Sequence, residues 1–254
     1  MRDISWSEIF DRIIIPSIAN TLEMLFFCFI FSSILGFTVA VALYMTQPGG
    51  LRENKAIYSI LNGGISILRS FPFMILMVSI IPITRVITGS SIGWVSALIP
   101  LTFASTPFMA RMIENSIKEV NPALVDAAKS FGASDWQIIF GVVLAEALPS
   151  LITGSILSII HVLNLTTVAG AIGAGGLGAS ALQYGYQSNN DKVMYSIIVI
   201  LICMVILIQY TGDRIYKKLK NKCVMEEEDE QKNCSIDRCG SHGFCYIHWR
   251  LRDE

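Results

Sequence analysis

Four residues near the C-terminus combine the side chains and the spacing of a candidate metal site. The run reads Cys239-x-x-His242-x-x-Cys245-x-x-His248. Thiolates and imidazoles bind zinc, but an even spacing of three residues differs from the paired ligands of common structural zinc sites. Metal binding, a reduced tail without fixed structure and an appended extension all stay open here, so no metal site is assigned.

A second pattern, Gly173-x-Gly175-x-x-Gly178, matches the dinucleotide-binding fingerprint letter by letter. That fingerprint requires a preceding strand, a following helix and an acidic residue about 20 positions further on. Here the glycines follow a long apolar segment that is suited to a membrane. We therefore reject nucleotide binding and expect either a re-entrant loop or a tightly packed extracytoplasmic loop, in which glycine lets backbones approach closely.

Ionisable and polar groups inside apolar segments are the remaining candidates, because such groups are costly in a membrane. Arg69 either lines a transport path or satisfies backbone carbonyls beside a helix break and pairs with a carboxylate. His161, Asn164, Thr166 and Thr167 form hydrogen bonds either to a substrate or to a neighbouring helix. No polar cluster at one depth suggests a membrane enzyme.

The composition indicates the elements that must position these groups. Of 254 residues, 53% are hydrophobic and 15% charged, and the mean hydropathy is +0.56. These values favour a membrane protein, and the absence of a cationic stripe with aromatics argues against nucleic acid as a partner. We predict an all-α integral membrane protein with five transmembrane helices, because each segment approaches the roughly 20 apolar residues that a span needs. The spans are Ala19 to Tyr44, Ile57 to Ile81, Ile92 to Ile113, Leu148 to Val168 and Val193 to Gln209.

The second span holds Arg69 and Pro72, so it is either a broken helix or a span that begins near Leu68 and runs towards Ile87. Acidic residues precede the first span, which is typical of a retained span rather than a cleaved signal. Lys and Arg are concentrated after the first, third and fifth spans, which predicts an outside N-terminus and a cytoplasmic C-terminus. We expect a membrane domain over residues 1–222 and a separate Cys- and His-containing cytoplasmic tail over 223–254.

A polar island, residues Glu119 to Glu146, interrupts the apolar segments on the cytoplasmic side. Asn121 and Pro122 predict a helix start, and Gly132 predicts its end. Ser134 and Asp135 then predict a second helix, with apolar residues on one face: Trp136, Ile139, Phe140 and Val143. From these residues alone, the island is either a docking element for a partner or an amphipathic connector on the membrane surface.

The island resembles the EAA loop of permease subunits of ATP-binding-cassette importers. The shared pattern is Asp126-Ala127-Ala128, three residues, Gly132, nine residues and Val142-x-Leu144. Asp126 replaces Glu, Val142 replaces Ile and Ala145 replaces Pro, which leaves open whether the second helix ends at Ala145 or runs on towards Pro149. The resemblance extends to about Lys222 and is nearest to methionine importer permeases. It is carried by Arg69-Ser70-Phe71-Pro72-Phe73, Pro100-Leu101-Thr102, Pro107-Phe108-Met109-Ala110-Arg111-Met112, Ala147-Leu148-Pro149, Gly173-Ala174-Gly175-Gly176-Leu177-Gly178 and Gly212-Asp213-Arg214-Ile215.

The resemblance implies a non-catalytic permease in a bacterial plasma (inner) membrane that imports D- or L-methionine or a related amino acid. Its implied partners are a second copy of itself, two ATPase subunits that hold ATP and Mg, and an extracytoplasmic binding protein. This chain has no Walker-type phosphate loop and is expected to hold no cofactor. The implied ATPase-coupling residues are Asp126, Ala127, Ala128, Phe131, Gly132, Trp136 and Leu144, and the implied translocation-path residues are Arg69, Asn164, Thr166, Thr167 and Val168. A permease for another small polar solute and a channel that works without an ATPase remain the alternatives.

Overall fold

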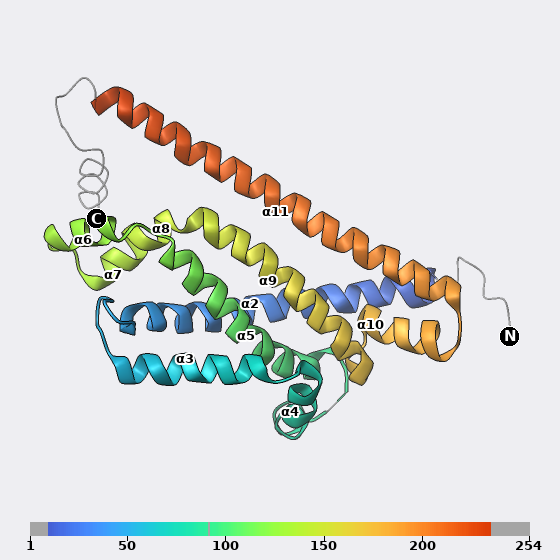
Figure 1. Cartoon of the computed structure of the whole chain (residues 1–254). Coiled ribbons are helices and arrows are strands. Elements are labelled where there is room, and N and C mark those ends of the chain that lie inside the picture. The colour runs from blue at the N-terminus through green and yellow to red at the C-terminus, as the bar shows by residue number, and fades with distance from the viewer. Residues whose placement is uncertain (1–9, 91, 235–254) are drawn as a thin grey trace.

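The structure, a computed structural model, describes residues 10–90 and 92–234, and every regular element in these ranges is helical. Long helices lie side by side along the molecule, with short helices gathered at its two ends (Figure 1). The elements are η1 (Phe10–Ile14), α2 (Ile15–Thr46), α3 (Lys55–Ser70), α4 (Phe73–Thr88), α5 (Trp94–Lys118), α6 (Pro122–Ser130), α7 (Asp135–Gln137), η2 (Ile138–Val143), α8 (Leu144–Glu146), α9 (Leu148–Ala169), η3 (Gly170–Ala174), α10 (Gly176–Ser180), η4 (Ala181–Gln187) and α11 (Asp191–Cys234).

Helix α2 packs most extensively against α5, and both pack against α9. The buried face of α2 carries small and polar residues at intervals of three or four, as the helical repeat requires. Gly36 lies on this face, where a Cβ atom would stand 2.8 Å from Cγ of Met109 on α5. Small residues thus bring α2 and α5 close together at the centre of the bundle.

Three helices are long and apolar enough to cross a membrane, namely Phe10–Thr46, Leu148–Ala174 and Asp191–Lys218. Helices α3 and α4 meet the same test only as a pair bent by 107°. The described residues therefore contain three candidate spans, or four with the bent pair. The predicted third span corresponds to α5, which has 25 residues but also contains two prolines and three charged residues, Arg111, Glu114 and Lys118. The count of five remains a prediction.

The segment predicted as the second span is divided into two helices, α3 and α4, as the broken-helix alternative stated. The break falls at Phe71 and Pro72, whose backbones are extended, with ψ of 131° and 129°. A residue before proline disfavours the helical conformation, and proline itself cannot donate the backbone hydrogen bond of a continuing helix. Arg69 lies in the last turn of α3, next to this break.

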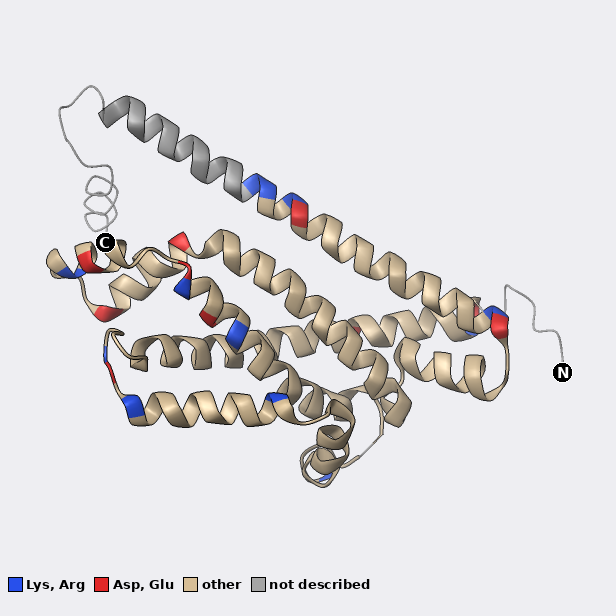
Figure 2. Cartoon of the chain, viewed as in Figure 1, with Lys and Arg blue, Asp and Glu red and all other residues tan. Residues whose placement is uncertain are grey.

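Charged residues are scarce along the middle of the bundle and frequent at the end that holds α6, α7 and α8 (Figure 2). The last helix is longer than predicted, since α11 has 44 residues and runs through the predicted domain boundary at residue 222. The Cys239 to His248 pattern lies outside the described residues. Within them, no group of three or more His, Cys, Asp or Glu side chains is placed to hold a metal ion.

Candidate functional sites: the polar island and a central cavity

The first island helix, α6, begins and ends where local sequence signals predicted. The Asn121 side chain accepts a hydrogen bond from the N–H of Ala123 at 3.0 Å, and Pro122 occupies the first turn. Gly132, which follows the helix, has a φ of +80°. This left-handed conformation is strained for residues with a Cβ atom, so glycine fixes the end of α6.

The second island helix begins with a capping box. The hydroxyl of Ser134 accepts from the N–H of Gln137, whose side-chain oxygen accepts from the N–H of Ser134 at 2.9 Å. The segments α7, η2 and α8 then continue one another to Glu146. The N–H of Ala147 donates to the carbonyl of Val143, and that of Leu151 donates to Ala147. The second island helix thus does not end at Ala145 but continues to Glu146, and Ala147, which has helical backbone angles, joins it to α9.

Both island helices are fixed to the bundle by an apolar core. Ala128 is fully buried, and Val143 is equally enclosed. The buried members of this core come from α2, α5, the island and its junction with α9: Ala40, Met109, Ile113, Ile117, Val120, Val125, Ala128, Ile138, Val142, Val143 and Ala147. Because the core is continuous, a displacement of the island must move the adjoining ends of α2 and α5 with it.

Apolar side chains remain on the outer surface of the island, which we call the aromatic surface and define as Phe131, Trp136 and Phe140. Their exposed fractions are 40%, 57% and 51%. The rings of Trp136 and Phe140 stack with centroids 5.8 Å apart, and Phe140 also contacts Phe37 of α2. The predicted apolar face is therefore split, since Ile139 and Val143 point into the core instead.

The seven predicted coupling residues differ in accessibility. Asp126, Phe131, Gly132 and Trp136 are exposed, and Ala127 and Leu144 are half-buried. Ala128 packs inside and can act only by holding α6 in place. One further link joins the island to the α2–α3 connection, where Nε of Arg52 lies 2.6 Å from Oδ2 of Asp135.

Sequence reasoning missed a buried charged cluster on α5. Glu114 is fully buried and pairs with Nη1 of Arg111 and Nζ of Lys118, each at 2.6 Å. Arg111 also donates a hydrogen bond to Oδ1 of Asn62 on α3. The spacing of three and four residues between these charges was the available signal, because it puts them on one helix face. The cluster connects α3 to the island end of α5.

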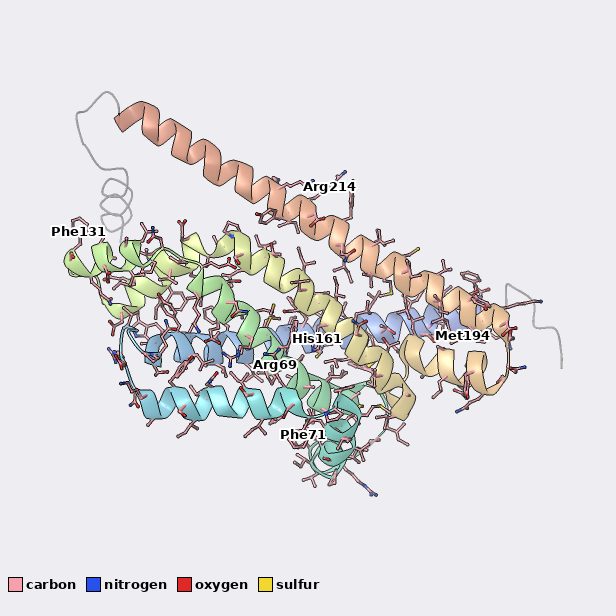
Figure 3. All side chains as sticks on the ribbon, viewed as in Figure 1. Arg69, Phe71, Phe131, His161, Met194 and Arg214 are labelled. Atoms are coloured by element: carbon pink, nitrogen blue, oxygen red, sulfur yellow. The ribbon has the colours of Figure 1, made fainter. Side chains whose placement is uncertain are left out.

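A cavity of about 230 Å³ lies at the break between α3 and α4. Arg69 and His161 both line it, and Figure 3 shows them near the middle of the molecule. The imidazole of His161 stacks on the ring of Phe108 with centroids 4.1 Å apart and an interplanar angle of 17°. The wall comprises Leu68, Arg69, Phe71, Phe73, Leu76, Ala104, Phe108, His161 and Leu165.

Of the predicted path residues, Arg69 lies in the described wall of this cavity, whereas the other four follow His161 along α9. Thr166 is buried, and its hydroxyl donates to the carbonyl of Leu163 at 2.7 Å. Thr167 is half-buried and donates to the same carbonyl, while Asn164 is exposed. Val168 is half-buried. The structure therefore gives these residues different surroundings rather than one common site.

The glycine pattern after α9 forms a close helix-to-helix packing. Gly173, Gly175 and Gly176 have positive φ values of 96°, 86° and 75°. A Cβ at Gly178 would overlap the carbonyl of Thr167, so only glycine permits this approach. The N–H of Leu177 donates to the hydroxyl of Thr21 at 2.9 Å and fixes the segment to α2.

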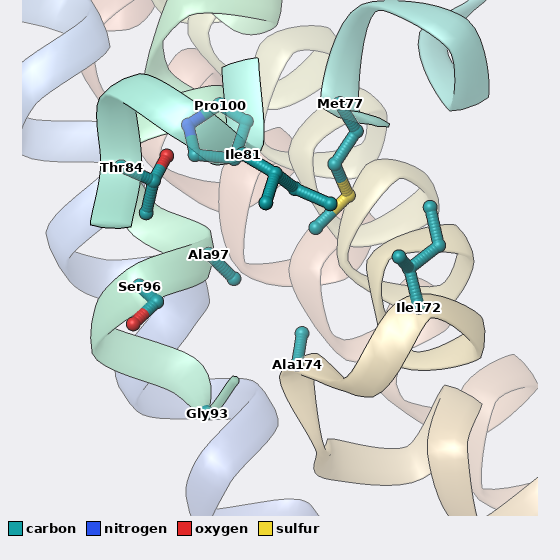
Figure 4. A pocket seen from close by; sticks show the side chains of 9 residues that line it. All are labelled: Met77, Ile81, Thr84, Gly93, Ser96, Ala97, Pro100, Ile172 and Ala174. Carbon is teal, nitrogen blue, oxygen red and sulfur yellow. The ribbon is translucent and has the colours of Figure 1, made fainter. Parts of the chain in front are cut away.

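A much smaller cavity, of about 10 Å³, lies between α4, α5 and the glycine segment (Figure 4). Its wall is mostly apolar, and the hydroxyl of Thr84 is a buried polar group without a hydrogen-bond partner among the described residues. A space of this size holds about one water molecule. It is too small for an organic substrate.

Residues 38–222 match the family model described as binding-protein-dependent transport system inner membrane component. A probable D-methionine transport system permease protein from Vibrio cholerae is 36% identical over 217 residues, which is 85% of this chain and 96% of that protein. A methionine import system permease protein from Bacillus subtilis is 40% identical over 173 residues, covering 68% of this chain and 78% of that one.

Chains of solved ABC transporter structures are also similar to this chain. A chain of the MetNI methionine ABC transporter, described as inward facing, is 40% identical with a TM-score of 0.82, covering 85% of this chain and 99% of that one. A chain of an amino acid ABC transporter solved with histidines has a TM-score of 0.68 at 18% identity, covering 84% of this chain and 95% of that one. The second likeness concerns the fold alone.

Proposed function

The chain belongs to the family of binding-protein-dependent transport system inner membrane components, and on this premise we propose that it is the permease subunit of an ATP-driven importer of methionine. The cargo is D- or L-methionine or a related amino acid. The observation that carries this proposal is the match to methionine permeases, which covers 85% of this chain both for the Vibrio cholerae relative and for the inward-facing structure. Relatives in this range of identity share a fold, and the named relatives share a substrate class.

In this proposal the chain crosses the bacterial inner membrane five times, with α5 as the third span and the broken α3 and α4 as the second. The N-terminus is outside and the C-terminus is cytoplasmic. The support is the distribution of charge, because the island end carries many basic residues, and cationic connections are retained in the cytoplasm (Figure 2). The low hydropathy of α5 is consistent with a span enclosed by protein rather than lipid.

The working unit that we propose is a pair of these chains with two ATPase subunits and an extracytoplasmic binding protein. ATP and Mg bind in the ATPase subunits, and this chain converts their closure into movement of the spans. A second copy would cover part of the exposed apolar area of the bundle. Lipid would cover the rest.

The island is the proposed contact with the ATPase. Its aromatic surface supplies an apolar contact, and the core beneath it links that contact to α2 and α5. An amphipathic connector lying on the membrane would use the same aromatic residues differently, by inserting them among lipids. The two functions differ in what happens when Trp136 is removed, since only the docking function requires it for coupling.

The direct test is purification of the chain with its ATPase subunit, followed by uptake of labelled methionine into proteoliposomes with the cognate binding protein. We expect uptake that needs both ATP and the binding protein. Uptake of another small polar solute, with methionine inert, would identify a different importer. Solute flux without any ATPase partner would identify a channel instead.

A further inference from the structure

The central cavity has the chemical features of a binding site for a free amino acid with an apolar side chain. We propose that it holds the transported methionine part-way across the membrane, with the carboxylate at Arg69 and the thioether side chain among Phe71, Phe73 and Phe108. This inference rests on the proposed function and adds a site to it. Different residues of the cavity wall would bind the carboxylate, the side chain and the ammonium group.

Arg69 is the one cation in the described wall, and the wall contains no carboxylate. Among the described residues, its guanidinium makes no hydrogen bond or ion pair, so it does not satisfy the carbonyls beside the helix break. A guanidinium binds a carboxylate through two parallel hydrogen bonds. Arg69 is exposed in the single chain and lines the cavity, so its guanidinium is accessible to an anionic group of the cargo.

The helix break places a second source of positive potential at the same position. Helix α4 begins at Phe73, in the wall, and Pro72 accepts from the N–H groups of Ile75 and Leu76. The N–H groups of Phe73 and Met74 precede these bonds and belong to the unpaired first turn of the helix. Interrupted membrane helices direct such N-termini at anionic substrate groups. The guanidinium of Arg69 and the N-terminus of α4 therefore both favour a bound carboxylate at the helix break.

The remaining wall suits a soft apolar side chain. Three phenylalanine rings line the cavity, together with Leu68, Leu76, Ala104 and Leu165. Sulfur–aromatic contacts are favourable by about 0.3–1.5 kcal/mol. The volume of about 230 Å³ lies below the roughly 300–1,000 Å³ of pockets for drug-sized ligands, which suits a molecule of amino-acid size.

His161 offers a hydrogen-bond partner for the ammonium group of an amino acid. Its ring is held against Phe108 by stacking and lies in the same wall as Arg69. In the neutral form an imidazole offers one acceptor nitrogen, which can take a hydrogen bond from the substrate ammonium group. A cationic side chain would find no carboxylate in the described wall, so the cavity selects against lysine- and arginine-like cargo.

The test measures equilibrium binding of labelled L-methionine to the detergent-solubilised permease–ATPase complex without the binding protein. Binding to the ATPase subunits alone is subtracted. We expect Arg69→Gln to weaken binding by about tenfold or more, since it removes a charged partner, and Arg69→Lys to weaken it less. Arg85→Gln is the matched control, because Arg85 is an exposed cation near the end of α4 outside the cavity wall.

L-Methioninol, which lacks the carboxylate, supplies a readout that a purely structural arginine would not affect. In the wild-type complex we expect methionine to bind more tightly than methioninol, and in Arg69→Gln we expect that difference to disappear. A wild-type complex that binds no methionine beyond its ATPase subunits would overturn the site. An unchanged methionine-to-methioninol ratio in Arg69→Gln would do the same. Both results would leave ATP-driven methionine uptake intact, whereas loss of that uptake in the wild type would contradict the proposed function itself.

Discussion

Arg111 and Glu114 form an ion pair inside the protein, with Nη1 of the arginine 2.6 Å from Oε2 of a glutamate that is fully buried. Lys118 contacts the second oxygen of the same carboxylate. Because Arg111 also reaches Asn62, this glutamate organises the junction between α3 and the island end of α5. Helix α3, which lines the cavity, is therefore fixed to the end of α5 that leads into the island.

We expect Glu114→Ala to destabilise the protein by about 3–5 kcal/mol, because it leaves the enclosed guanidinium without its partner. The measurement is thermal unfolding of the detergent-solubilised permease–ATPase complex. Glu119→Ala, an exposed glutamate just beyond the same helix, is the control and should change stability by less than about 0.5 kcal/mol. Equal effects of the two substitutions would show that the buried pair is unimportant.

Two glycine substitutions should act in opposite directions. Gly178→Ala should cost about 1–3 kcal/mol, because the new methyl group would overlap the carbonyl of Thr167 and push α10 away from α9. Gly63→Ala lies inside α3 with no atom within 4 Å of the new Cβ, and it should stabilise by about 0.5–1 kcal/mol. The same unfolding measurement compares them. Tolerance of alanine at position 178 would contradict the close packing.

Removal of the aromatic surface should uncouple transport. In Trp136→Ala we expect normal membrane insertion but loss of most ATP-driven uptake, because an exposed apolar anchor for the ATPase is removed. Tyr195→Ala, which removes an exposed aromatic from the opposite end of the molecule, should transport normally. Uptake and co-purification with the ATPase are both recorded. A Trp136→Ala variant that retains both would favour the membrane-surface connector.

Gly132→Trp addresses the same surface through the backbone. A side chain at a φ of +80° is strained, so the end of α6 should shift and displace the neighbouring Phe131. We expect a membrane-inserted protein whose ATPase is no longer stimulated by the loaded binding protein. Normal stimulation together with normal uptake would refute the docking assignment of the island.

Cysteine labelling separates the two threonines of α9. In a background with the native cysteines replaced by serine, Thr167→Cys should react with a permeant thiol reagent at a rate that changes during turnover. Thr166→Cys should stay unreactive, because that side chain is 1% exposed and packs inside the protein. A labelling rate at position 167 that does not change during turnover would argue against a place on the translocation path.

Local signals made the island predictable. The helix ends of the island are set by Asn121, Gly132 and Ser134. Each of these residues acts on neighbours only a few positions away, so its effect can be predicted from the sequence. The break at Phe71 and Pro72 was predictable for the same reason, since proline restricts its own neighbour. Helix ends were less predictable, as the length of α11 shows, because continuation of a helix depends on gradual differences in propensity.

The sequence by itself determined the class of protein, its all-helical structure, the caps of the island and the likeness to importer permeases, because composition, periodicity and capping are local properties. Only the tertiary structure decided which of these residues meet. It buried Ala128 and Val143 while exposing Trp136, enclosed Glu114 between two cations, and brought Arg69 into one cavity wall with Phe108 and His161. Those juxtapositions join residues far apart in the chain, and they follow from how whole helices pack rather than from any short stretch of sequence.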